Sequence, residues 1–408
     1  MDPNSHLRNE LLLDAAGMCA KLGTPLSGVL ISGDVAFAGD TAEYAFALSW
    51  LEDLCSRCGT TLANVFVIPG NHDVVRSVAS RHVIQALHHD IKAAVSDVAL
   101  DGILRGLLSD PEAKRLLYES LNNYNLFAGQ FFCDLLPPER SIATRELILN
   151  DGSILRLSGL NSTFVSSTAD RAGDLFVDPA CFQISRKEGV EHLVMCHHPY
   201  HWLRHGDSLR DHLNDVARIH LFGHEHTNRI EMGRDWVRVA ASAAHPDRTE
   251  RGWEPGYNLL ELTVFGSELD RYLDVRVHVR IWQQRPDQFR AKMDRESDVF
   301  RHTIKLDAWV PSSLAATNPV ESAVLSGSPL PLEPARSEPM DTLRDISVRF
   351  FKLTLSQKSS IAGKLDLLEE QDLNQPDFER FRRVFIRARD RGLLEDLDRE
   401  IQAAMESR

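Results

Sequence analysis

Four short apolar runs in this chain each end directly at a cluster of polar side chains of the kinds that bind metal ions. A short continuous apolar run that stops at such a cluster is typical of a buried strand. Apolar residues at helical spacing, over Leu7–Cys19 and Thr41–Cys58, precede the first two runs. This alternation predicts an α/β sheet with parallel pairing. The four clusters are Ser32–Asp34, Gly70–Asp73, Cys196–Pro199 and Gly223–His226.

These clusters are expected to converge, because ligands of open α/β sheets bind beyond the carboxyl ends of the strands. Carboxylate, amide oxygen and imidazole ligands together suit Mn, Fe, Zn or Ni better than Ca or a thiolate cluster. A single aspartate after a strand is more often a helix cap, and a single histidine is more often a core or surface residue. Four such groups in order, each at a strand end, favour a metal site.

The clusters resemble the calcineurin-like metallophosphoesterase superfamily, whose pattern is DxH, GD, GNH(D/E), H and GHxH. The resemblance covers about residues 7–285 and implies a four-layer α/β/β/α sandwich. The stretch from Ser32–Asp34 through Glu43–Tyr44 to Trp50–Leu51 further resembles the cyclic-nucleotide and glycerophosphodiester branch, the class III phosphodiesterases. The expected fold class is therefore α/β, with a helical insertion and a C-terminal helical bundle added to the sandwich.

The resemblance implies two divalent metal ions, whose identity is left open among Mn, Fe, Zn and Ni. Their ligands would be Asp34, Asn71, His197, His224 and His226. Asp34 would bridge both ions, and His226 would bind the first ion. The other three residues would complete the protein ligands of the second ion.

The implied reaction is phosphoester hydrolysis by attack of metal-bound hydroxide, with two cations stabilising the entering and departing oxygens. His72 would lie beside the leaving-group oxygen as general acid or electrostatic stabiliser, and Asp73 would hold it. An imidazole that titrates near neutrality is a natural proton donor, and a carboxylate partner fixes its tautomer. Small phosphodiesters or cyclic nucleotides are the leading substrates.

One family motif, the opening DxH, is not found before Leu7, where Asp2 and His6 are three residues apart instead of one. We expect this motif just upstream of Met1, which predicts weak or no activity for the chain as written. The alternative of another class is a non-catalytic sensor or adaptor, whose incomplete metal site binds a phosphorylated ligand.

Other polar residues near the clusters each have two possible roles. His198, His201 and His205 would contact substrate or be polar surface, and Arg76 would meet a substrate phosphate or be a solvated arginine. Cys55 and Cys58 form a CxxC at the end of an amphipathic helix without a second pair, so an ordinary helix end is favoured over a metal or redox role.

The chain divides into a metallophosphoesterase domain over residues 1–305, a linker over 306–340 and a helical module over 341–408. Residues 77–136 read as a helical insertion. The linker holds six of the 18 prolines and has no hydrophobic period. Strand-like segments at 146–149, 154–160, 193–196, 219–222, 237–241, 259–264 and 275–282 make the second half rich in β-structure.

The predicted module of about four helices shows Leu343, Ile346, Phe350 and Leu353 on one face. It resembles small helical effector-associated modules of bacterial conflict and signalling proteins. Such a bundle behind a linker suits recruitment of a protein partner or self-association. A stabilising appendage that packs back on the enzyme is an equal alternative, and the arginines of residues 380–391 are expected to form a solvated face.

Composition excludes several other classes. With 408 residues, 43% hydrophobic and 26% charged, the chain can bury a full core, and no apolar stretch is long enough for a membrane span. Six scattered cysteines and no leader sequence predict a cytoplasmic protein. The net charge of −13 disfavours nucleic acid, so a nuclease ranks below a small-molecule phosphodiesterase. A protein phosphatase ranks last, because the arginine-bearing signature that follows GD in that branch is absent and residues 35–40 read VAFAGD.

Overall fold

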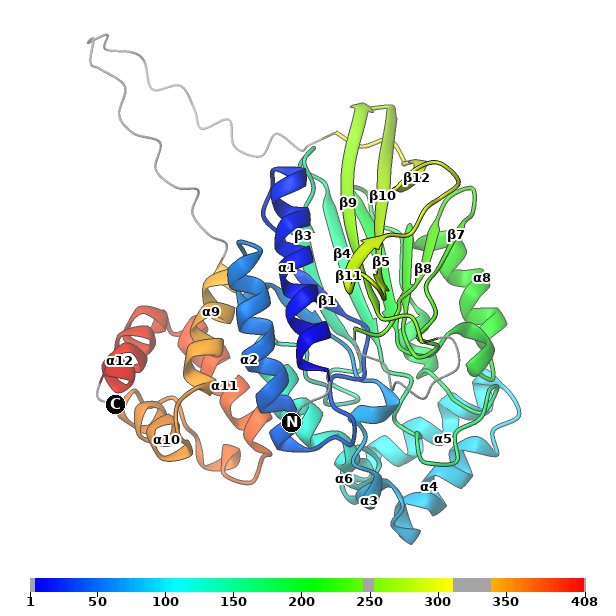
Figure 1. Cartoon of the computed structure of the whole chain (residues 1–408). Helices are drawn as coiled ribbons and strands as arrows, with labels where there is room; N and C mark the ends of the chain where they lie inside the picture. Colours follow the sequence, from blue (N-terminus) through cyan, green and yellow to red (C-terminus); the bar gives the residue numbers. More distant parts are fainter. Residues whose placement is uncertain (1–3, 245–252, 311–338, 407–408) are drawn as a thin grey trace, which may run out of the picture.

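The computed structural model describes residues 4–244, 253–310 and 339–406 (Figure 1). Two short strands, β1 (Val29–Ile31) and β2 (Val65–Val67), pair in parallel. Helix α1 (Ser5–Leu22) precedes β1, and α2 (Thr41–Arg57) connects the two strands. The helix–strand alternation predicted for this region is confirmed. No helix in the described ranges is long and apolar enough to cross a membrane.

A six-stranded sheet follows, with the order β3-β4-β5-β6-β8-β7. Its strands β4, β5, β6 and β8 are parallel to one another, whereas β3 and β7 are antiparallel edge strands. Helix α8 (Gly206–Val216) crosses from β5 to β6. The strands are β3 (Ala143–Ile148), β4 (Ile154–Leu160), β5 (Val190–Cys196), β6 (Ile219–Phe222), β7 (Arg229–Met232) and β8 (Val237–Ala240).

A third, antiparallel sheet is built around the long strand β10, which pairs with β9, β11 and β12. Its hairpin extends beyond the segments predicted from the sequence, because strand pairing continues into polar residues such as Arg271 and Asp274 that show no apolar run. The strands are β9 (Gly256–Ser267), β10 (Asp270–Gln283), β11 (Gln288–Ala291) and β12 (Phe300–Lys305).

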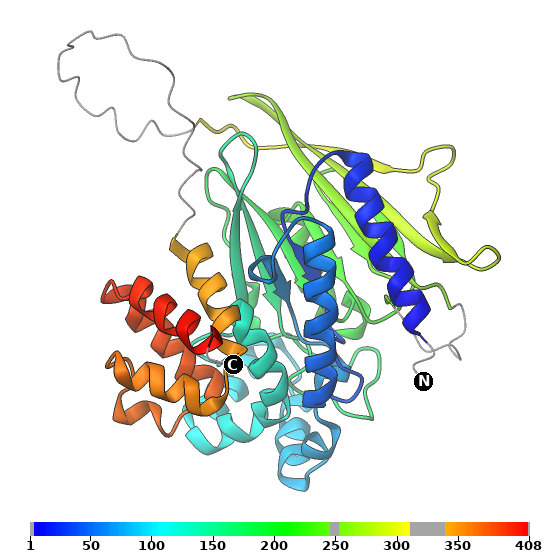
Figure 2. The ribbon, with the colours of Figure 1, turned by 60° about the vertical axis from the view of Figure 1, so that its left-hand side comes forward.

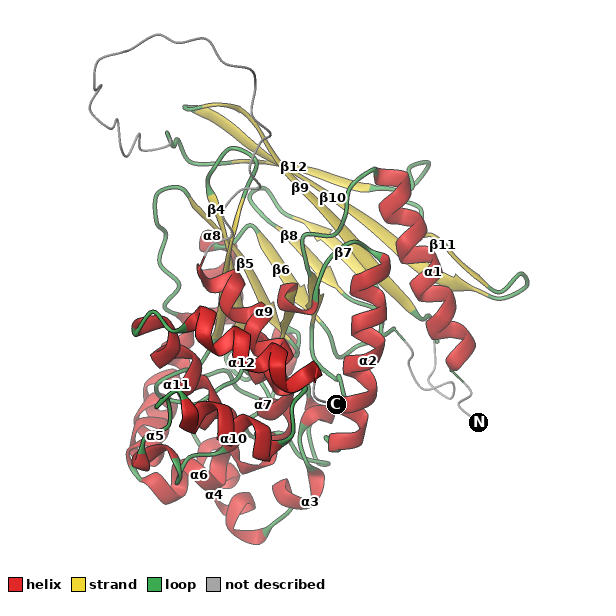
Figure 3. Cartoon of the chain, turned by 90° about the vertical axis from the view of Figure 1, so that its left-hand side faces the viewer, coloured by secondary structure: helices red, strands yellow, loops and turns green. Residues whose placement is uncertain are grey.

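Two cores lie on the two faces of the six-stranded sheet. Alternate residues of β5 show the division, since Leu193 and Met195 join the core shared with the other sheets, whereas Val194 and Cys196 pack toward α8. Residues of α1 and α2 cover the outer face of the first core. The layers are therefore helix, sheet, sheet and helix, and the predicted four-layer α/β/β/α architecture is confirmed (Figure 3).

Helices fill the chain between β2 and β3, where the sequence predicts a helical insertion. They are α3 (Arg76–Ala79), α4 (His82–Lys92), α5 (Asp97–Ser109), α6 (Pro111–Tyr118) and α7 (Asn122–Ala128). Buried residues of α4, α5 and α6, among them Ile91, Leu104 and Leu117, join the second core. That these helices form a separate inserted unit remains a prediction, and the predicted linker lies mostly outside the described residues.

The C-terminal residues fold into four helices around their own core, as predicted. Phe132, just after α7, belongs to this core, so the bundle packs back on the rest of the protein (Figure 2). The helices are α9 (Pro339–Phe351), α10 (Leu355–Lys364), α11 (Asp377–Asp390) and α12 (Leu394–Glu406).

The expectation that the arginines of residues 380–391 form a solvated face is partly wrong, since Arg389 and Arg391 are exposed but others are held inward. Arg387 contacts Asp372 and Glu369 within the bundle. Arg382 donates to Asp134 at 2.5 Å across the contact with the preceding domain. The sequence suggested solvation because acids surround the arginines along the chain, but Asp372 and Asp134 are buried and hold the guanidinium groups inward.

Candidate metal centre

The ends of four strands bring Asp34, Asn71, His197 and His224 together. These residues follow β1, β2, β5 and β6, respectively. His197 Nε2 lies 3.0 Å from Asn71 Oδ1 and 3.3 Å from Asp34 Oδ2. His224 Nδ1 lies 3.0 Å from the same Asn71 oxygen. The convergence expected from the sheet topology is therefore present for these four predicted ligands.

The loops that carry these side chains have unusual backbone geometry. Asp34, His224 and His226 have positive φ angles of 55°, 70° and 54°. Gly33 has φ +100°, and a Cβ at this position would lie 2.5 Å from His197 Nδ1. Non-glycine residues with positive φ angles have a strained backbone, and such residues cluster at functional sites. His226 stands half-buried two residues after His224 in the same loop.

The tautomer of His197 shows why a cation fits between these residues. Its Nδ1 lies 2.7 Å from the carbonyl oxygen of Ser32, which can only accept a hydrogen bond, so Nδ1 carries a proton. In the neutral ring Nε2 is then an acceptor, yet it faces the oxygens of Asn71 and Asp34. Three acceptors facing each other require a positive charge among them, either a proton or a metal ion. A backbone carbonyl on the other ring nitrogen is typical of metal-binding histidines.

The electrostatics of the site agree with the need for a positive charge. Burial would lower the pKa of His197, but attraction to Asp34 raises it, so a proton on His197 supplies the charge when no metal ion is bound. Burial alone would raise the pKa of Asp34, but attraction to His197 and hydrogen bonds from His197 and the His72 amide hold that pKa well below its usual value. Burial lowers the pKa of His224 to about 3, with repulsion from His197 adding to the effect. A neutral imidazole and an ionised carboxylate are the forms that bind metal ions.

The predicted role of Asp73 as the partner of His72 is wrong. The Asp73 carboxylate is fully buried and accepts hydrogen bonds from the amides of Ala36 at 3.0 Å and Gly70 at 2.8 Å. It also accepts from the hydroxyl of Tyr44 at 2.9 Å. Burial and the nearby Asp34 charge raise its pKa to about 6, against the effect of these donors. Asp73 thus ties the loop after β1 to the loop after β2, which makes it a positioning residue.

His72 is held by Phe37 instead. Its Nδ1 lies 2.8 Å from the Phe37 carbonyl oxygen and 3.2 Å from Arg76 Nη2. Both contacts fall on Nδ1, so Nε2 is left for substrate. The His72 amide donates to Asp34 Oδ1 at 2.8 Å, which fixes the ring beside the centre. The guanidinium of Arg76 lies 5.8 Å from the centre of the Phe37 ring. No local motif pairs Phe37 with His72, so sequence reasoning missed this contact.

Comparison with known families identifies the domain that carries these residues. Residues 19–228, a little more than half of the chain, match the model of the calcineurin-like phosphoesterases. This chain belongs to the calcineurin-like phosphoesterase family. Residues 342–403 match the model of the GTPase-associated adaptor domain. A search of curated proteins finds no match to the chain.

Family membership confirms the resemblance drawn from the four clusters, and the adaptor-domain match confirms the C-terminal region as a helical module of an interaction family. Calcineurin-like phosphoesterases generally use divalent metal ions. The carboxylate, amide and imidazole groups of this calcineurin-like phosphoesterase fit such ions by their chemistry.

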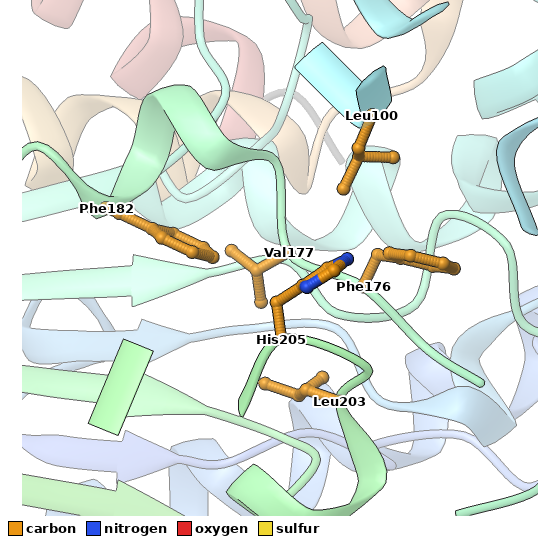
Figure 4. A pocket seen from close by; sticks show the side chains of 6 residues that line it. All are labelled: Leu100, Phe176, Val177, Phe182, Leu203 and His205. Carbon is orange, nitrogen blue, oxygen red and sulfur yellow. The ribbon is translucent and has the colours of Figure 1, made fainter. Parts of the chain in front are cut away.

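The remaining histidines near the centre of this calcineurin-like phosphoesterase differ in exposure. His201 is exposed and its Nε2 lies 2.8 Å from Glu225 Oε1. His205 lines a separate, mostly apolar cavity of about 10 Å³, where its Nδ1 lies 3.3 Å from Asp97 Oδ1 (Figure 4). That volume holds about one water molecule, so this cavity is no substrate site. His198, by contrast, is fully buried beside the centre.

Proposed function

We propose that this calcineurin-like phosphoesterase is a phosphodiesterase that acts on small phosphodiesters, cyclic nucleotides among them. The observation that carries the proposal is the set of facing acceptors formed by His197 Nε2, Asn71 Oδ1 and Asp34 Oδ2 at the strand ends. Such a set can take up a proton or a metal ion, and a divalent metal ion at the carboxyl edge of this sheet is what phosphoester chemistry needs.

In this proposal Asn71, His197 and His224 would hold one divalent ion, His226 would hold a second, and Asp34 would be a ligand of each. Bound divalent ions would neutralise phosphoryl oxygens and lower the pKa of a bound water. Mn, Fe, Zn and Ni all suit these ligands.

The residues around the ions would orient the substrate and move protons. His72 would hold a proton at Nε2 and give it to the leaving-group oxygen, while the Phe37 carbonyl keeps the ring turned inward. Asp73 would keep the loops of Asp34 and Asn71 in register through its bonds to Ala36 and Gly70.

The mouth of the site favours a substrate with a planar group. Phe37 is 64% exposed, and its ring centre lies 5.2 Å from that of His72. An exposed phenylalanine beside the proton donor offers a stacking face for a nucleobase, and Arg76 lies within reach of its phosphate. This arrangement supports a nucleotide-type phosphodiester.

A second candidate function is a non-catalytic sensor or adaptor. The observation that favours it is the match of residues 342–403 to the GTPase-associated adaptor domain. In that case the centre would bind a phosphorylated ligand without turnover, and the helical module would contact a protein partner or a second copy of the chain. A nuclease is disfavoured by the net charge of −13.

Hydrolysis of bis(p-nitrophenyl) phosphate separates these functions. The chain is assayed with added Mn²⁺ and with a chelator, beside the variants His224→Ala and His89→Ala, the latter an exposed histidine of α4. Because the opening DxH motif is not found before Leu7, we expect only weak metal-dependent turnover, which His224→Ala abolishes and His89→Ala preserves. Metal binding without turnover of this diester, of cyclic nucleotides or of aryl phosphomonoesters would favour the sensor.

A further inference from the structure

The third histidine at the centre, His198, directly follows His197 after the end of β5. Its ring centre lies 4.8 Å from that of His197 and 4.5 Å from that of His224. The side chain is 0% exposed, so it is neither polar surface nor an open substrate contact. Both readings left open by the sequence are therefore excluded.

The two nitrogens of His198 have different surroundings. Nδ1 lies 2.8 Å from Ser162 Oγ, which also accepts from the His198 amide at 3.3 Å. Nε2 is buried, and the described part of the chain offers it no hydrogen-bond partner. A buried polar atom without a partner costs about 1–3 kcal/mol, which calls for an explanation.

Other buried histidines also have ring nitrogens without a hydrogen-bond partner, but His198 differs from them in lying at the centre. His88 lies in α4, and His192 lies at the other end of β5. In His197, His198 and His224, by contrast, one nitrogen of each ring lies within 4.8 Å of the others. Within residues 4–244, 253–310 and 339–406, no other three histidine, cysteine or acidic side chains lie close enough together to share one metal ion.

We infer that His198 is a further ligand, through Nε2, of the metal ion held by His197 and His224. A metal on Nε2 requires the ring proton on Nδ1, where Ser162 Oγ is placed to accept it. The ion would then be bound by three imidazoles beside the oxygens of Asn71 and Asp34. A nitrogen-rich set of this kind selects Zn, Ni or Fe over Mg and Ca. The inference rests on the proposed centre and adds a ligand to it.

The test is calorimetric titration of the full chain with Mn²⁺ and with Zn²⁺ alone, comparing His198→Asn with His198→Gln. The amide of asparagine reaches the position of Nδ1 and keeps the contact to Ser162, whereas the amide of glutamine reaches the position of Nε2. We expect His198→Asn to weaken binding at least about tenfold, and His198→Gln to weaken it less. His192→Gln, a buried histidine of the same strand away from the centre, is the control and should bind like wild type.

A second variant covers the case in which His198→Asn does not fold. Ser162→Ala leaves the imidazole in place but releases its tautomer, and it should weaken metal binding by a smaller factor. Unchanged affinity in the folded variants of His198 and Ser162 would overturn the inference while leaving wild-type binding and turnover, and thus the proposed function, intact. Absence of metal binding in wild type would overturn both.

Discussion

At the residue scale, Phe37 combines an exposed aromatic ring, 64% accessible, with a place beside the proposed proton donor His72. Stacking of a base on an aromatic ring contributes about 1–3 kcal/mol, and an exposed ring lies at the low end. Phe37→Ala should therefore lower kcat/KM about fivefold for 2′,3′-cyclic AMP, with no change for glycerophosphoethanolamine, which has no ring.

Phe46 gives a matched control for this prediction, since it is 54% exposed on α2, where Arg8 covers its ring. Phe46→Ala should leave both substrates unaffected. Equal losses on both substrates in Phe37→Ala would show that Phe37 only supports His72 through the loop, and the nucleobase face would be abandoned.

His220 makes folding sensitive to acid. It is fully buried in β6, where burial, and then Arg238, lower its pKa from 6.5 to about 4 against the hydrogen bonds to Leu213 and Ala217. Because the unfolded chain then binds the extra proton, the free energy of unfolding falls as pH drops from 6.5 toward 4. At pH 5 the loss is about 2 kcal/mol from this residue.

Urea unfolding at about pH 7.5 and about pH 5 measures this loss. His220→Gln removes the titrating group, so its stability should depend on pH less steeply than that of wild type, by about 2 kcal/mol between the two conditions. His88, whose pKa burial also lowers to about 4, should keep part of the slope. Identical slopes for the variant and wild type would contradict this account of His220.

The role of each residue was harder to predict from the sequence than which residues form the site. The identities of Asp34, Asn71, His197 and His224 follow from their places at strand ends, and these four do meet. The partner of His72 could not be read from the sequence, because a backbone carbonyl 35 residues away leaves no side-chain signature. That the five proposed ligands bind metal remains a prediction.

At the element scale, the loop after β1 can accept only glycine at position 33. Alanine there would need a positive φ and would place its Cβ 2.5 Å from His197 Nδ1 and 2.8 Å from Gly70 Cα. Gly33→Ala should destabilise the fold by about 1–3 kcal/mol and weaken metal binding through the displaced His197. Thermal unfolding and metal titration measure the two effects.

The control is Gly102→Ala in α5, where an added Cβ meets no atom within 4 Å. That change should leave metal binding unaltered and stabilise the helix by up to about 1 kcal/mol. If Gly33→Ala bound metal like Gly102→Ala, the close approach of the two loops would not matter for the centre.

The contact of α11 with the residues after α7 depends on Arg140, which donates to the buried Asp134 at 2.6 Å and to Glu379 at 2.7 Å. Removal of this guanidinium leaves two buried carboxylates short of a partner. Arg140→Ala should therefore cost about 1.5–3 kcal/mol in chemical unfolding. Arg399→Ala removes an exposed pair with Asp396 and should cost at most about 1 kcal/mol. Equal costs would mean that the helical module is not anchored through Arg140.

Strands with a clear pattern of apolar residues could be predicted from the sequence. Strands that form mainly through hydrogen bonds to a neighbouring strand could not. β5 and β6 are buried on both faces, and β4 and β8 are buried on at least one, so their apolar residues stand out in the sequence. β7, β11 and β12 are short or half-exposed and exist because a neighbouring strand offers hydrogen bonds, which the chain itself does not show.

At the scale of the whole molecule, a calcineurin-like phosphoesterase domain and a GTPase-associated adaptor domain share one chain and contact each other. Both alternatives for residues 341–408 have support, because this region packs back on the preceding domain and its residues 342–403 match an adaptor domain. The packing could not be predicted because Asp134 and Arg382 lie 248 residues apart in the sequence.

The most direct test of the central claim is an anomalous difference map from crystals of the full chain grown with Mn²⁺ and measured at the manganese edge. The account predicts a peak among Asp34, Asn71, His197 and His224, at about 2.0–2.3 Å from the nearest ligand atoms. A map without a peak at the strand ends, or with manganese only at other histidines, would contradict the account.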